Sequence, residues 1–154
     1  MAVSREPFGT DREGRNVEKL TLRRDGLEAE IITFGAALRA LRVPDRTGRP
    51  VDVVLGFDRV EDYEICGGYL GATVGRYANR IAGASCLIDG QRAALEANEG
   101  TKQLHGGPAG FSHRVFGVLE TGESSVTLGY VSADGEGGFP GTLTLRVTCA
   151  LDGR

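Results

Sequence analysis

Apolar and polar residues alternate over short stretches of this chain, and glycine-containing turns separate the stretches. Residues 17–24 and 27–34 alternate in part and flank an Asp-Gly dipeptide, which is favoured in tight hairpin turns. Residues 86–95 repeat this arrangement around a second Asp-Gly dipeptide. The pattern therefore predicts two antiparallel hairpins, one early in the chain and one after its midpoint.

Other short stretches carry the same strand signals. Residues 36–43 are ambiguous, because their alanines and leucines also favour a helix, but the short length and the proline that follows favour a strand. Residues 56–63 predict a single helical turn with Asp58 as its N-cap. The remaining predicted strands before the C-terminal one are residues 51–55, 115–120 and 125–132.

The last predicted strand, residues 142–151, carries apolar residues at every second position from Leu143 to Cys149, which predicts one buried face. An Asp-Gly dipeptide follows the strand, and this normally announces a hairpin with a partner strand. We therefore expect a truncated sheet whose exposed edge is able to pair with another chain.

The composition favours one globular domain. With 154 residues, 40% of them hydrophobic, the chain is long enough for a single core. Residues 1–16 are polar and rich in turn formers, so we expect a lead-in with mobile ends ahead of a domain over residues 17–154. Glycine accounts for 24 residues, about twice the usual share of roughly 7%, with no triplet period, which indicates many turns and an all-β fold.

Charge and hydropathy narrow the range of partners. The formal net charge of -3 provides no broad basic field, so we expect neither nucleic acid nor an anionic membrane as a partner. No apolar run approaches the roughly 20 residues of a membrane span, and the N-terminal residues lack the apolar core of a signal peptide. We expect a cytoplasmic protein that binds a neutral small molecule.

The cysteines and histidines offer no recognisable metal site. Cys66, Cys86 and Cys149 are widely spaced and form no CxxC pair, which argues against a disulfide framework and a structural zinc site. His105 and His113 are the two histidines, so a metal would need distant carboxylates or cysteines as further ligands. We expect no metal and interpret His113 as structural.

Side chains suited to ligand binding gather in the middle of the chain. Arg76, Asn79 and Arg80 place two guanidinium groups and an amide within five residues, and such donors suit multidentate polar ligands such as sugar hydroxyls. His105 precedes two glycines, which permit unusual backbone torsions and the close approach of a ligand. The hairpin at 86–95 can bring the cluster and His105 to one end of a sheet.

Several ordered motifs make the chain resemble the aldose 1-epimerase (galactose mutarotase) family. They are GATVGRYANRI at residues 71–81, Asn98, LHGG at 104–107 followed by Gly-Phe at 110–111, and DGEGGFPG at 134–141. The resemblance spans nearly the whole chain but covers only about the first half of the family's domain. It implies an antiparallel β-sandwich, of the galactose mutarotase-like supersandwich type, that is truncated here.

The resemblance also implies a function. The family interconverts the α and β anomers of hexoses such as galactose and glucose, without a cofactor. This reaction needs a base for the anomeric hydroxyl and an acid for the ring oxygen. In the family these are a glutamate and a histidine of the second half, so no residue here matches a catalytic position.

What carries over to this chain is sugar binding. Asn79 and Arg80 match the family's Asn-Arg pair, and His105 matches the histidine of its Leu-His-Gly-Gly motif. Arg76 and Asn98 lie in the same motifs, and we expect them to support the loops. The ligand implied is an aldohexose.

Other interpretations of the same residues stay open. Without the family, His105 can be paired with Glu99 or Glu136 as an acid and a base. The chain can also be a carbohydrate-binding module without catalysis, or an inactive fragment. The glycine-rich residues 134–141 lack the Lys-Ser/Thr ending of a phosphate-binding loop, and we expect a packed turn there.

Overall fold

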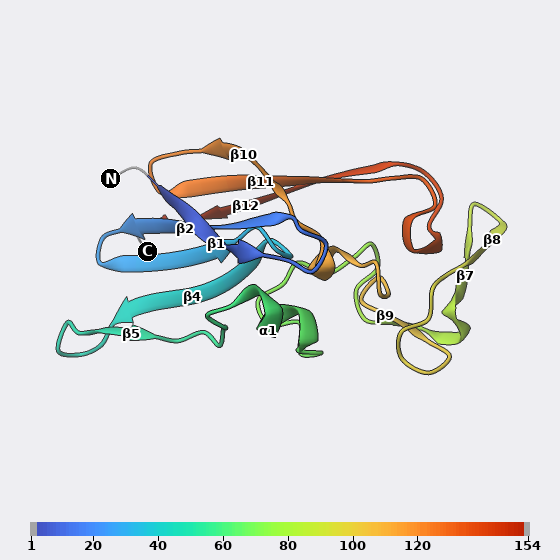
Figure 1. Ribbon diagram of the computed structural model, residues 1–154, viewed down its shortest axis with the longest axis horizontal. Coiled ribbons are helices and arrows are strands. Elements are labelled where there is room, and N and C mark those ends of the chain that lie inside the picture. The colour runs from blue at the N-terminus through green and yellow to red at the C-terminus, as the bar shows by residue number, and fades with distance from the viewer. Residues whose placement is uncertain (1–2, 153–154) are drawn as a thin grey trace.

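The computed structural model describes residues 3–152, which are almost entirely β-structure (Figure 1). The short helical elements are α1 Val60–Ile65, η1 Ala82–Ala84, η2 Phe111–His113 and η3 Glu136–Gly138. The strands are β1 Ser4–Thr10, β2 Asn16–Arg24, β3 Leu27–Ile32, β4 Ala37–Pro44, β5 Pro50–Asp52, β6 Arg80–Ile81, β7 Ser85–Ile88, β8 Gln91–Ala94, β9 Gln103–Leu104, β10 Gly117–Thr121, β11 Ser125–Ser132 and β12 Leu143–Ala150.

The N-terminal strands form one antiparallel sheet in sequence order, from β1 to β5. The predicted first hairpin is confirmed as β2 and β3. Its turn residues Asp25 and Gly26 have positive φ values of 49° and 82°, as a type I′ turn requires. The hairpin of β7 and β8 is also confirmed, and it forms a small separate ribbon at one end of the molecule (Figure 1).

The second larger sheet consists of β10, β11 and β12, again antiparallel. Its inner face packs against β2 and β3, so the described residues form an antiparallel sandwich (Figure 1). Leu20 and Ile31, which are partners across β2 and β3, and Leu128 on β11 are fully buried in the shared core. The other buried members of this core are Leu22, Ala29, Ala36, Phe111, Phe116 and Val126.

A second apolar cluster forms around α1. It joins Val60 and Tyr63 of the helix to Val17, Ile32 and Phe34. The helix begins at Val60 after Arg59, so the prediction of Asp58 as the N-cap is wrong. The Asp58 carboxylate instead bonds the guanidinium of Arg39 on β4, which removes it from the helix terminus.

Three predictions about the ends and faces of the sheets need correction. The expected lead-in over residues 1–16 contains β1, which pairs with β2 along its length although its residues are mostly exposed. The predicted strand at 51–55 ends at Asp52, because the Asp52 carboxylate accepts the backbone N–H groups of Leu41 and Val54. The apolar face predicted for β12 is only half buried, and Leu143 is 36% exposed.

The face of the N-terminal sheet opposite the main core carries a network of ion pairs. Glu30, whose side chain is 8% exposed, lies 2.9 Å from the Arg42 guanidinium and 3.7 Å from the Lys19 ammonium, and it also bonds Arg39. Burial alone would raise the pKa of Glu30, but the hydrogen bond from Arg42 and the charges of Arg39 and Lys19 outweigh burial and lower it. Glu30 is therefore the shared anion that binds β2, β3 and β4 together.

We expect Glu30→Gln to destabilise the protein by about 3 kcal/mol, because it leaves partly buried arginines without their shared anion. Glu28→Gln is the matched control, since Glu28 pairs with Arg42 but is 25% exposed, and we expect a cost below about 1 kcal/mol. Urea unfolding of both variants measures the difference in free energy. Equal losses would show that Glu30 is not the centre of the network.

Candidate functional site

The predicted ligand-binding residues meet at the short ribbon of β6 and β9. Arg80 pairs with Leu104, and Ile81 pairs with Gln103, in antiparallel register. Asn79 directly precedes β6, and His105 directly follows β9. The structure thus brings together Asn79, Arg80 and His105, which the sequence predicts as site residues.

Asn79 and His105 hold each other by a reciprocal pair of hydrogen bonds. The His105 backbone N–H donates to the Asn79 carbonyl over 3.0 Å, and the Asn79 backbone N–H donates to Nδ1 of the His105 ring over 2.9 Å. Because Nδ1 accepts, the proton of the neutral imidazole belongs on Nε2. The ring therefore presents an N–H donor at Nε2.

Both residues have left-handed backbone conformations, with φ of 69° at Asn79 and 51° at His105. Such values are uncommon outside glycine and cost of order 1–3 kcal/mol each, so the surrounding contacts must hold them. Residues held in this way cluster at ligand sites. The strain marks this pair as a candidate for a function beyond folding.

Arg80 is not a free cation. Its Nε and Nη2 lie 2.5 Å and 2.7 Å from the two carboxylate oxygens of Glu99, and its Nη1 donates to the Asn79 side-chain oxygen over 3.3 Å. The hydrogen bonds from Arg80 lower the pKa of Glu99, so Glu99 is ionised at neutral pH. Arg80 and Glu99 are half exposed and form the rim of the site.

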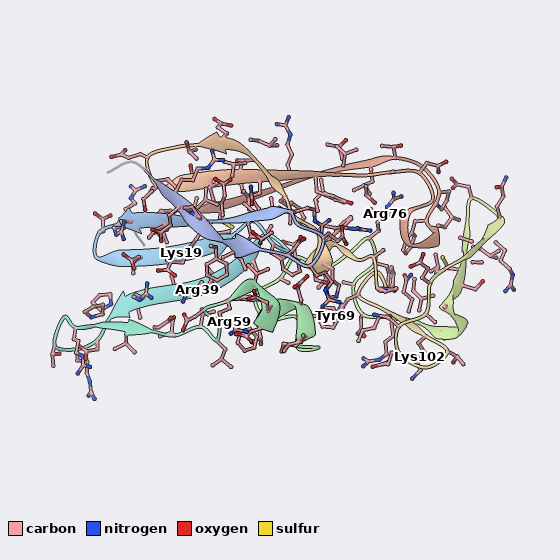
Figure 2. All side chains as sticks on the ribbon, in the orientation of Figure 1. Lys19, Arg39, Arg59, Tyr69, Arg76 and Lys102 are labelled. Carbon is pink, nitrogen blue, oxygen red and sulfur yellow. The ribbon has the colours of Figure 1, made fainter. Side chains whose placement is uncertain are left out.

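Arg76 and Asn98 support the loops, as predicted. The Asn98 amide accepts from the Leu104 backbone N–H over 2.6 Å and donates to the Leu104 carbonyl over 3.0 Å. Arg76 donates to four backbone carbonyls and to the Ser132 hydroxyl, at 2.7–3.1 Å. Figure 2 places Arg76 beside the ends of β11 and β12. Arg76 therefore ties these two strand ends to residues 75–81, which we call the GRYANRI segment.

The carboxylate of Glu136 is also engaged. It accepts from the Tyr130 hydroxyl over 2.6 Å, bonds the Ser132 hydroxyl and pairs with Arg114 at 2.8 Å. Burial, with the hydrogen bond to Glu136, raises the pKa of Tyr130 to about 12. Within residues 3–152, Glu136 thus holds a packed turn together, and no hydrogen bond joins His105 to Glu136 or to Glu99.

Gly106 and Gly107 have positive φ values of 87° and 80°, which confirms the prediction of unusual torsions. The space beside Gly106, however, is filled by protein. A Cβ atom there would lie 1.7 Å from the Gly75 carbonyl oxygen, so the backbone of the GRYANRI segment takes the place expected for a ligand.

Sequence reasoning missed Tyr69, which lies next to the site (Figure 2). Its ring meets the His105 ring edge-on, with centroids 4.8 Å apart, and meets the His113 ring at 6.3 Å. His113 packs against Phe34 in turn, and burial lowers its pKa, with help from the charge of Arg12. His113 is structural, as predicted. The signal for Tyr69 was its position between two glycines, at 68 and 71, just before the GRYANRI segment.

Among residues 3–152, no group of three or more His, Cys, Asp or Glu side chains is arranged to hold a metal ion. Over the same residues, no helix has the length and apolarity to cross a membrane.

The chain is similar to known proteins along nearly its whole length. A family model described as aldose 1-epimerase matches residues 18–154. The chain belongs to the aldose 1-epimerase family. Galactose mutarotase from Bos taurus is 44% identical over 99% of this chain, and aldose 1-epimerase from Escherichia coli K12 is 37% identical over 90% of it.

Solved structures of aldose 1-epimerase relatives share the fold. The GalM/aldose epimerase homologue from C. elegans superposes with a TM-score of 0.81 at 34% identity, over 86% of this chain and 41% of that one. Galactose 1-epimerase from Lactobacillus acidophilus NCFM superposes with a TM-score of 0.82 at 24% identity, over 98% of this chain and 45% of that one. These likenesses confirm the predicted all-β, antiparallel fold.

The aldose 1-epimerase homology extends over only part of each relative. The matched region is 45% of the Bos taurus protein and 40% of the Escherichia coli protein. The chain therefore spans about half the length of the curated relatives that it matches.

We expect Gly106→Ala to disrupt the site, because its Cβ would collide with the Gly75 carbonyl oxygen. Gly83→Ala is the matched control, since Gly83 also has a positive φ, 64°, but open space around it. The left-handed conformation alone costs about 1–2 kcal/mol, and the collision adds about 2 kcal/mol at Gly106. Chemical denaturation measures both losses. Equal losses would contradict the close approach.

Proposed function

We propose that this chain supplies the sugar-binding part of an aldose 1-epimerase that interconverts the α and β anomers of a hexose such as galactose or glucose. The observation that carries the proposal is the reciprocal Asn79–His105 pair, which fixes Nε2–H of His105 as a donor, while the Asn79 side chain accepts from the Arg80 guanidinium. Directed N–H donors of this kind bind the oxygen atoms of sugar hydroxyls.

The same geometry assigns no acid and base to the described residues. Mutarotation needs one group to accept the anomeric proton and another to protonate the ring oxygen. Glu99 is held in its ionised form by Arg80, and Glu136 is bound to Tyr130 and Arg114. We propose that the catalytic pair comes from outside this chain, and that the chain alone does not catalyse the reaction.

The open edge of β12 is where we propose that further strands join. Among the described strands, β12 pairs only with β11, and its apolar residues Leu145, Val147 and Cys149 are only partly buried. An edge with unpaired backbone groups and a half-exposed apolar face is a site for strand addition. Since the chain spans about half of its relatives, we propose that the added strands are the remaining part of the family fold.

A second candidate is a carbohydrate-binding module without catalysis, acting in the cytoplasm as the enzyme would. The observation that favours it is that the donors of Asn79, Arg80 and His105 are assembled within the chain, whereas its nearby carboxylates are occupied. Both candidates predict binding without turnover by the isolated chain, so turnover by the complete protein separates the enzyme from the module.

The 154-residue chain is expected to bind galactose and not to accelerate its mutarotation. We expect Arg80→Ala and His105→Ala each to weaken binding about 10- to 100-fold, because each removes a directed donor. Arg92→Ala is the control, since Arg92 lies on β8, where it bonds Ser85. Calorimetric titration measures binding, and polarimetry of α-D-galactose measures turnover.

Two outcomes would contradict what both proposals share. Catalysis by the isolated chain would show that a described carboxylate is the base after all. Binding that is unaffected by either variant would contradict the assignment of the site.

Pairing through β12 predicts association of the isolated chain as its concentration rises. We expect Leu143→Lys, which puts a charge on the half-buried face of β12, to keep the chain monomeric. Val131→Lys is the control, because Val131 lies on β11 and is already 60% exposed. Sedimentation velocity measures the association, and equal behaviour of the two variants would contradict pairing through this face.

A further inference from the structure

We propose that Tyr69 is a positioning residue for His105, holding its imidazole in the orientation that presents Nε2–H to a sugar. This inference rests on the proposed function for the role of Nε2–H, and on the structure for the contacts. Tyr69 is half buried beside the site and is not itself one of the donors already assigned.

The first contact is between the rings. The Tyr69 and His105 centroids lie 4.8 Å apart with an interplanar angle of 68°, which is the edge-to-face geometry that aromatic pairs favour. The hydrogen bond from the Asn79 backbone to Nδ1 fixes one point of the imidazole but leaves the ring free to tilt about it. The Tyr69 ring limits that tilt from the side.

The second contact is made by the Tyr69 hydroxyl. The Asn98 amide donates to this hydroxyl over 3.3 Å, and the same amide side chain holds both the N–H and the carbonyl of Leu104. Leu104 is the residue directly before His105. One asparagine thus links the tyrosine to the backbone from which the imidazole projects.

Tyr69 itself is held by the sheet and the core. Its carbonyl accepts from the Ala72 backbone N–H over 3.1 Å, and the next glycine, Gly71, accepts from the Leu38 N–H over 3.1 Å on β4. Behind the Tyr69 ring lies the His113 ring, which packs on Phe34 of the second apolar cluster. The row of four rings therefore connects His105 to packed apolar side chains.

The backbone of Tyr69 has a positive φ, as do those of Asn79 and His105. Its φ of 52° is left-handed, which is rare for a large aromatic residue and persists only where neighbouring contacts require it. The ring contact with His105 and the hydroxyl contact with Asn98 are two such contacts. The geometry therefore assigns Tyr69 to the orientation of His105 rather than to a general loop.

The test uses the ring nitrogens of the two histidines, which nitrogen-15 NMR resolves without a ligand. We expect His105 to be a single Nε2–H tautomer in the protein. We expect Tyr69→Leu to convert it to a mixture of tautomers, because a ring that tilts misaligns the Asn79 N–H to Nδ1 hydrogen bond that fixes the tautomer. Tyr77→Leu is the matched control, since Tyr77 is a tyrosine close to Tyr69 in the sequence but is 52% exposed. A His105 tautomer that is unchanged in Tyr69→Leu would overturn the proposal.

Galactose binding provides the second measurement. We expect Tyr69→Leu to weaken binding about tenfold, the size of one lost neutral hydrogen bond. Because Tyr69 acts through His105, the double variant with His105→Ala should bind no more weakly than His105→Ala alone. Additive losses would overturn the proposal. If His105→Ala leaves binding unchanged while Tyr69→Leu still alters the tautomer, the proposed function fails and the positioning role stands.

Tyr69→Phe keeps the test decisive if the leucine variant does not fold. It preserves the ring and removes the acceptor of Asn98. We expect the His105 tautomer to be retained and the Leu104 amide to exchange its hydrogen faster. Unchanged exchange at Leu104 would show that the Tyr69 hydroxyl does not support Leu104 through Asn98. Loss of the single tautomer would show that the Tyr69 ring alone does not orient His105.

Discussion

The close approach of two backbone segments, at Gly75 and at Gly106, is the constraint on which the candidate site depends. No Cβ fits at Gly106 without colliding with the Gly75 carbonyl, and the same carbonyl accepts the Phe111 backbone N–H over 3.2 Å. The Phe111 ring lies where a side chain at Gly75 would stand. The two segments contact each other through backbone atoms. These contacts fix the segment that carries Arg80 relative to the segment that carries His105.

The burial of apolar residues is uneven between the strands of the sandwich. Val126 and Leu128 of β11 are fully buried, whereas the apolar residues of the neighbouring β12 are only partly covered. The core is thus closed on the side of β2 and β3 and remains open along the last strand.

The sequence predicted the parts of the structure that depend on local chemistry. Both Asp-Gly hairpins were found because their turn residues have positive φ values that few other dipeptides tolerate. The strand β1 was missed because its residues are mostly exposed, so apolar alternation was absent. The candidate site residues Asn79, Arg80 and His105 lie in ordered motifs that the sequence shows, but Tyr69 and the Arg80–Glu99 pair depend on packing between distant segments. The alternation of apolar and polar residues indicates strands, but it does not indicate which distant segments pack together.

The pairing of Arg80 with Glu99 has a consequence for the charge of the ligand. The guanidinium already has both oxygens of a carboxylate at 2.5 Å and 2.7 Å, so the rim of the site is electrically balanced before any ligand arrives. A phosphorylated sugar would have to displace Glu99 or lie beside its negative charge, and either carries an electrostatic cost. A free sugar meets no such cost, because its hydroxyls can share the guanidinium with the carboxylate. For the hexose site that we propose, this charge balance favours unmodified hexoses over sugar phosphates.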